Sequence, residues 1–198
     1  MAQYENYKLS RTVSVKEIVT ADYFTGCHPG ACVHVHPDAW ELCCCLGGTL
    51  TLLRDFREIP LQKGQTALVQ PGTPHDLLVR DEHAATFVVS FTCSGEYLRT
   101  VQNSVVTFTQ EQLRLFYSMV EELRSGFKQD NHQVHLVSFR PSEDSPFGAE
   151  QMICSYLEQI LITLLRSVTM KNGEIVRSDR FKDAMQSYLA ERVYSYIQ

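Results

Sequence analysis

Three histidines and one glutamate in the first half of the chain have a spacing that suits a metal ion. His34 and His36 are separated by one residue, Glu41 follows shortly after, and His75 ends a Gln-Pro-Gly-Thr-Pro-His run. On an extended strand His34 and His36 would point to the same face, about 6.6 Å apart along the backbone, which the side chains of two ligands can close. Three imidazoles and a carboxylate suit Zn, Ni, Mn or Fe(II). An open coordination position would make such an ion a Lewis acid or an anchor for a ligand.

The same side chains have a second interpretation, in which they line a ligand pocket as polar groups satisfied by hydrogen bonds and water. Trp40, the only tryptophan, either belongs to the core or rim of the fold or stacks on a flat ligand. Strand alternation over residues 40–46 places Cys43 and Cys45 on the face of Glu41, where buried cysteines act as small hydrophobic groups. The candidate ligand-binding residues are therefore His34, His36, Trp40, Glu41, Cys43 and His75.

The remaining histidines fall in turns or weakly patterned segments, where we expect them to be solvated. They are His28, His83, His132 and His135.

Short strands must position these residues. Up to Cys93, β-branched and aromatic runs are interrupted by Gly and Pro turns, which is typical of many short strands that form a sandwich or barrel. The expected strands cover residues 12–19, 31–36, 40–46, 48–54, 66–70, 75–80 and 85–93.

The period becomes helical after Phe108. Thr109-Gln-Glu-Gln112 matches a capping box and begins a predicted helix. Its apolar positions are Leu113, Phe116, Val120, Leu123 and Phe127. Residues 128–147 predict a loop that can include one short strand over 133–139.

A second helix is predicted from Ser145-Pro146 to Asn172-Gly173, and a third from about Ser178. The apolar stripe of the second helix spans about five turns. We expect it to pack on the barrel and to be wide enough to bury against a second copy as well.

Composition and charge limit the class of protein. The chain has 198 residues, 44% hydrophobic and 21% charged, which is ordinary for a globular fold. The net charge of -5 is spread evenly, so no basic half exists to bind DNA or RNA. Seven cysteines, three of them consecutive, and a start without a signal peptide predict a reduced, cytoplasmic protein. No apolar stretch is long enough to cross a membrane.

The motif His34-x-His36-x4-Glu41-x6-Gly48, followed by Pro71-Gly72-x2-His75, resembles the paired motifs of the cupin barrel. The metal ligands of that family are two His, one Glu and a further His, which correspond here to His34, His36, Glu41 and His75. The resemblance implies an α+β fold: a small cupin-type β-barrel, or double-stranded β-helix, over residues 1–108, followed by C-terminal α-helices over residues 109–198.

Further segments resemble the N-terminal effector-binding domain of AraC-type transcriptional regulators. They are Trp40-Glu41, Val88–Cys93, Phe147–Gln151, Tyr156–Arg166 and the final helix, Tyr188–Ile197. The resemblance implies that the helical region dimerises and that a helix-turn-helix module, which alone would bind DNA, lies downstream of residue 198.

These observations leave three functions open. The leading hypothesis is a sensor that binds a small-molecule effector in the barrel and is not an enzyme. The alternative is a stand-alone cupin metalloenzyme, a dioxygenase or isomerase, although the sequence shows no obvious acid or base beyond the four metal-ligand candidates. A purely structural dimerisation module would leave the three histidines and the glutamate without a purpose.

Overall fold

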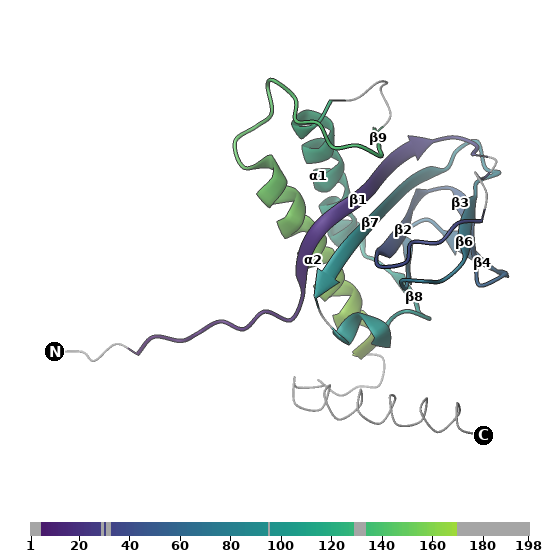
Figure 1. Ribbon diagram of the computed structural model, residues 1–198. Coiled ribbons are helices and arrows are strands. Elements are labelled where there is room, and N and C mark those ends of the chain that lie inside the picture. The colour runs from purple at the N-terminus through teal and green to yellow at the C-terminus, as the bar shows by residue number, and fades with distance from the viewer. Residues whose placement is uncertain (1–4, 29, 31–32, 95, 129–133, 170–198) are drawn as a thin grey trace.

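The computed structural model describes residues 5–28, 30, 33–94, 96–128 and 134–169 (Figure 1). In chain order the elements are β1 (Ser14–Thr25), β2 (Trp40–Gly47), β3 (Thr49–Arg54), β4 (Arg57–Gln62), β5 (Gln65–Val69), β6 (His75–Leu78), β7 (Ala85–Ser94), the 3-10 helix η1 (Glu96–Thr100), β8 (Val105–Thr107), α1 (Gln110–Gly126), β9 (Val134–Leu136) and α2 (Ala149–Thr169).

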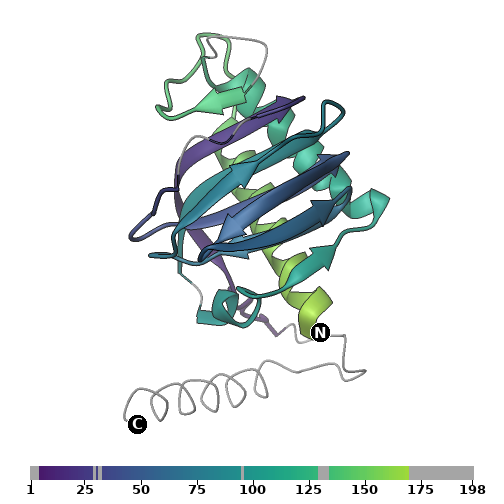
Figure 2. The ribbon, with the colours of Figure 1, turned by 90° about the vertical axis from the view of Figure 1, so that its right-hand side faces the viewer.

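Two antiparallel sheets and a pair of helices form three layers. The middle layer is a six-stranded sheet in the order β8-β5-β2-β7-β1-β9, and a three-stranded sheet, β4-β3-β6, covers one of its faces. Helices α1 and α2 lie side by side across the opposite face (Figures 1 and 2). Each face of the middle sheet therefore packs against a different partner. Within the described residues, no helix is both long and apolar enough to span a membrane.

Strand β2 is buried on both faces because it lies in the middle of these layers. Its even-numbered residues, such as Leu42 and Cys44, pack with the helices in a large cluster that we call the helix-side core. Its odd-numbered residues Cys43 and Cys45 pack between the two sheets in a smaller cluster, the inter-sheet core. The inter-sheet core also contains Leu50, Leu52, Leu61, Ala67, Val69, Val79, Ala84 and Val88.

A glycine makes the tight turn from β2 to β3. Gly48 has a φ of 62°, and a Cβ atom there would lie 2.6 Å from a carboxylate oxygen of Asp81 and 2.9 Å from the backbone of Ala84. Only glycine fits this position without strain. The Asp81 carboxylate in turn accepts hydrogen bonds from the Thr49 amide (2.9 Å) and the His83 amide (2.8 Å), which fixes the turn against the loop before β7.

Helix α1 begins at the predicted capping box. The Gln112 amide donates to the Thr109 hydroxyl, and the Thr109 amide donates to the Gln112 side chain. The apolar stripe that follows is buried as predicted, and Phe116 packs edge-on against Phe87 and Phe108 at centroid distances of 5.9 and 5.3 Å. The capping and the stripe together account for the position and orientation of α1.

Helix α2 begins at Ala149, about one turn later than predicted from Ser145-Pro146. Its stripe is buried, with Ile153, Leu157, Ile160, Leu161, Leu164 and Leu165 all in the helix-side core. The predicted end at Asn172-Gly173 and the third helix from Ser178 lie outside the described residues.

Several strand predictions were wrong. Within the described part of 31–36 the chain forms an isolated bridge at His34 in place of a strand. The second half of β1, β4, η1 and β8 were not predicted. β4 contains Pro60, which is tolerated because β4 is an edge strand. It follows a two-residue turn, Asp55-Phe56, whose φ angles of 51° and 60° are unusual without glycine, so no turn signal marked it.

Candidate metal centre

Backbone hydrogen bonds bring the two motif segments together. His34 and His75 exchange bonds in both directions, from the His34 amide to the His75 carbonyl (2.9 Å) and from the His75 amide to the His34 carbonyl (3.0 Å). The Gly72 amide also donates to the His36 carbonyl at 2.8 Å. Residues about forty positions apart in the sequence are thus held at fixed register, and the third imidazole joins the first two.

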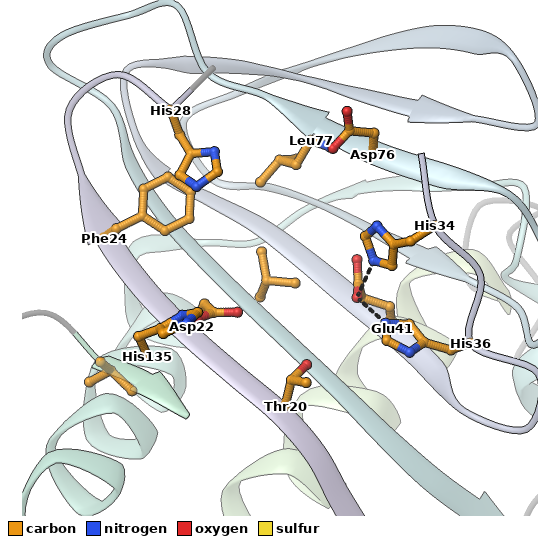
Figure 3. Close-up of a pocket in the computed structure, with 12 residues that line it drawn as sticks. Thr20, Asp22, Phe24, His28, His34, His36, Glu41, Asp76, Leu77 and His135 are labelled. Carbon is orange, nitrogen blue, oxygen red and sulfur yellow. Dashed lines mark hydrogen bonds and ion pairs between the residues drawn. The ribbon is translucent and has the colours of Figure 1, made fainter. Parts of the chain in front are cut away.

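The four predicted metal ligands form one cluster. His36 Nε2 lies 3.2 Å and His34 Nε2 lies 4.0 Å from Glu41 Oε2, and His75 Nε2 lies 3.1 Å from Glu41 Oε1. Figure 3 shows the rings of His34 and His36 directed at the Glu41 carboxylate. The side chains of Glu41 and His75 are 8% and 2% exposed, against 41% for His34 and 20% for His36. The cluster is therefore deep on one side and open to the cavity on the other.

Glu41 is held as a carboxylate by the imidazoles. Burial alone would raise its pKa, but the interactions with the neighbouring imidazoles of His34, His36 and His75 outweigh burial and hold the pKa well below its ordinary value. A buried, ionised carboxylate ringed by three imidazoles is an arrangement that a cation can stabilise.

The orientation of His75 fits a metal ion. Its Nδ1–H faces the Thr73 carbonyl at 2.8 Å, which leaves the Nε2 lone pair directed inwards. The buried Nε2 lies near Glu41 but makes no hydrogen bond of good geometry. One ligand atom from each of the four residues lies within 4.8 Å of all the others, close to the roughly 4.2 Å that opposite ligands of one ion span. The four residues present therefore fit a divalent transition metal.

Two hydroxyl groups support Glu41 from the neighbouring strands. The buried Ser90 hydroxyl on β7 donates to Glu41 Oε2 at 2.8 Å, and the Thr20 hydroxyl on β1 donates to Ser90 Oγ at 2.9 Å. The register explains this row, because Glu41 is opposite Ser90 and Ser90 is opposite Thr20. The row orients the carboxylate and extends polar character along the floor of the sheet.

A cavity of about 390 Å³ opens beside the cluster (Figure 3). Its lining residues come from β1, β2, β6, β7, β9 and the segment before β2. They are Thr20, Asp22, Phe24, His28, His34, His36, Glu41, Asp76, Leu77, Val88, Val134 and His135. The cavity is large enough for a small organic molecule in contact with the cluster.

Four of the six predicted ligand-binding residues lie at the cavity or in the cluster, and two lie in the hydrophobic cores. Three of them, His34, His36 and Glu41, line the cavity, and His75 lies directly behind them in the cluster. Cys43 points into the inter-sheet core, and Trp40 packs in the helix-side core on the opposite face of β2 from Glu41. The alternative interpretation of Trp40 as a core aromatic is the one that describes its position.

Two of the histidines expected in turns or weakly patterned segments also line the cavity. His28 forms an isolated bridge with Val79, and its ring packs on Phe24 at a centroid distance of 4.9 Å. His135 lies on β9, where it pairs with Asp22. The expected exposure holds for His83 and His135, whereas His28 is half-buried and His132 lies outside the described residues.

The consecutive cysteines are inert thiols in this environment. Burial raises the pKa of Cys44 to about 12 and that of Cys45 to about 11, and it raises the pKa of Cys43 strongly as well. The six cysteines in the described part of the chain are all free. Their role as small hydrophobic groups agrees with the sequence prediction.

The fold and the His/Glu cluster together resemble a cupin domain with a candidate metal site. A family model described as "Cupin domain" matches residues 26–91, a span that contains all four members of the cluster. The predicted α+β architecture, a cupin-type β-barrel followed by α-helices, is thereby confirmed. No curated protein sequence matches the chain significantly.

The matches to solved structures have low sequence identity and low TM-scores. A cupin protein from Bacteroides fragilis is 18% identical, with 55% of this chain and 100% of that chain covered at a TM-score of 0.34. The protein TT1209 from Thermus thermophilus is 20% identical, with 46% and 90% covered at a TM-score of 0.34. The cupin domain of Cnp3 from Schizosaccharomyces pombe is 10% identical, with 45% and 58% covered at a TM-score of 0.34.

Proposed function

We propose that this chain is the effector-binding and dimerisation part of an AraC-type transcriptional regulator. A small molecule occupies the cavity, and a divalent transition metal on His34, His36, Glu41 and His75 anchors it. The observation that supports this proposal is the double burial of β2. One strand places Glu41 in the cluster and the neighbouring side chains against the helices.

A change at Glu41 has a short path to the helices. Leu42 and Cys44 flank the inward-facing residues on β2 and pack in the same core as α1 and α2. A ligand shifts the helices only as far as it prefers one of their arrangements, with coupling of typically about 1–3 kcal/mol. When bound, the metal supplies a positive charge that holds an anionic oxygen of the ligand. The chain's own residues orient that charge and exclude water behind His75.

The proposed output is dimerisation and DNA binding. The helix-side core uses most of the α2 stripe within one chain, while Ile162 and Val168 remain half-buried and available to a second copy. Dimers through the C-terminal helices would align two DNA-binding modules attached after residue 198. Light scattering of the purified chain, with and without ligand, measures this association.

The first experiment is metal analysis of protein purified without chelator. We expect close to one equivalent of a transition metal, a higher melting temperature with metal than without, and loss of both in His75→Ala. His83→Ala, at an exposed histidine outside the cluster, is the matched control and should bind metal normally. Less than about a tenth of an equivalent, even after incubation with Zn, Ni, Mn and Fe(II), would contradict the metal anchor.

The sensor is then tested with a screen of sugars, organic acids and aromatic metabolites. A true effector should raise the melting temperature of the metal-loaded protein. At a concentration a hundred times its dissociation constant, it should add about 2.7 kcal/mol to the free energy of unfolding. It should also change the association of the chain. If no compound shifts either measurement, the sensor proposal fails.

A metalloenzyme is the second candidate, and one observation favours it. The cavity holds further titratable groups, namely Asp22, His28, Asp76 and His135, whereas the sequence showed no obvious second acid or base. Oxygen uptake and sugar isomerisation by the metal-loaded protein would test this candidate, with His75→Ala as the inactive control. Metal-dependent turnover would favour the enzyme, and an unchanged rate in His75→Ala would exclude this site as its centre.

A further inference from the structure

A second polar group lies across the cavity from the metal cluster. Asp22 on β1 and His135 on β9 form an ion pair between Asp22 Oδ1 and His135 Nδ1. Figure 3 shows this pair on the opposite side of the cavity from His34, His36 and Glu41. Neither residue belongs to the motif that contains the metal ligands.

The sheet register sets the distance between the two groups. Val88 on β7 lies opposite both Cys43 and Asp22, and Asp22 lies opposite His135, so one row of side chains crosses four strands on the cavity side. Asp22 is two strands and two residues away from Glu41, which corresponds to about 12 Å between their Cα atoms at ordinary sheet spacing. A gap of this order is comparable with the length of one small ring compound and its substituents.

Apolar side chains occupy the space between the two polar groups. Val88 lies between them on β7, and Leu77 and Phe24 also line the cavity. Figure 3 shows the Leu77 side chain pointing into the cavity between the two groups, and the Phe24 ring beside His28. A ligand with an apolar body and a polar group at each end therefore matches the sequence of polar, apolar and polar side chains along the cavity wall.

The Asp22–His135 pair favours a hydrogen-bond donor. A carboxylate has about four lone-pair sites and the bond from His135 uses one, so Asp22 retains acceptor capacity towards the cavity. Its side chain is 25% exposed, and burial raises its pKa despite the opposing influence of His135. A second carboxylate on a ligand would meet like charge at Asp22 and would be rejected.

We infer that Asp22, oriented by His135, determines ligand specificity by accepting a hydrogen bond from a hydroxyl or amino group at the far end of the ligand. The ligand class is then a small carboxylate with an apolar body and a donor at the end distant from the carboxylate. This inference rests on the proposed function, because the metal cluster holds the near end.

The test compares four probes by calorimetry on the metal-loaded full chain: benzoate, 4-hydroxybenzoate, 4-(aminomethyl)benzoate and terephthalate. The wild type should bind the two donor-bearing probes at least about tenfold more tightly than benzoate, as expected for a hydrogen bond to a charged group, and terephthalate most weakly. In Asp22→Ala this preference should disappear while benzoate affinity is kept. In Asp22→Asn, which matches the shape of the side chain, the discrimination against terephthalate should weaken.

Controls separate this inference from the proposed function. Asp144→Asn and His83→Gln, at exposed positions outside the cavity, should keep the preference, whereas His135→Gln should reduce it. Equal binding of benzoate and 4-hydroxybenzoate, an unchanged preference in Asp22→Ala, or no binding of any probe would overturn the inference. Metal content and the broad ligand screen would still decide the proposed function, since neither depends on Asp22.

Discussion

The two faces of the six-stranded sheet differ in composition and in use. The helix-side core is a continuous apolar cluster in which aromatic rings interlock, as Phe116 does with Phe87 and Phe108. The inter-sheet core is smaller and gives way to the polar cluster and the cavity. The residues that stabilise the fold and the residues of the candidate metal site therefore lie on opposite faces of the same strands. Four substitutions test this division.

The largest effect is expected from Phe116→Ala. Removal of a fully buried ring from the helix-side core should lower the free energy of unfolding by about 3–5 kcal/mol, while metal affinity stays unchanged. Urea unfolding and metal titration measure the two quantities. Tyr117→Ala, next to it but 40% exposed, should cost much less. A Phe116 variant that unfolds normally but loses metal would refute the division between the faces.

Ser90→Ala should have the opposite pattern. Loss of the hydroxyl that orients Glu41 should weaken metal binding about 10–100-fold, the usual effect of removing such a supporting group. The stability of the metal-free protein should change little by comparison. Thr92→Ala is the matched control, because Thr92 lies on the same strand and bonds Glu17 at an exposed position. Equal metal affinities in the two variants would show that Ser90 does not support the cluster.

Thr109→Ala should cost about 1 kcal/mol of stability by removing the N-cap of α1. Ser125→Ala near the end of the same helix, where the hydroxyl bonds only helix carbonyls, should cost less. Thermal unfolding of both variants gives the comparison, and metal affinity should be the same in each. A change in metal affinity on loss of this cap would mean that the two faces are coupled even without ligand.

The smallest effect is expected from pH and Asp22. Burial raises the pKa of this carboxyl, the paired His135 opposes the rise, and Glu41 adds to it. The folded state therefore holds the proton more tightly than the unfolded state. Stability of the metal-free wild type should fall as pH rises from the ordinary aspartate pKa to the raised value. Asp22→Asn should lack this fall, so urea unfolding of both proteins across that range should diverge; parallel curves would contradict the shift.

The metal cluster could be predicted because its members lie in two short motifs. His34, His36, Glu41 and His75 are recognisable by type and spacing, even though the strand predicted under the first two is a single bridge. The alternation of side chains along β2 also predicts that Trp40 faces the helices. If Glu41 and Cys43 face inwards, the residue just before Glu41 must face the helices.

The far side of the cavity could not be predicted. Asp22 lies beyond the predicted end of the first strand, and His135 reaches the cavity only because β9 pairs with β1 across more than a hundred residues. Register between distant strands depends on side-chain packing over the whole sheet, and no local pattern marks it. The β3–β4 turn was missed for a related reason, since Asp55-Phe56 adopts positive φ without a glycine to signal it.

Strand β9, which lies between α1 and α2 in the chain, separates part of the cavity wall from the rest of the barrel in the sequence. The four candidate metal ligands and the inter-sheet core all precede α1 in the chain, but part of the cavity wall comes from the segment between the two helices. Substitution of His135 can therefore alter the cavity wall while the four clustered residues and the buried Val134 and Leu136 stay intact. Variation at this one exposed position would change the cavity of related chains without disturbing the core or the four clustered residues.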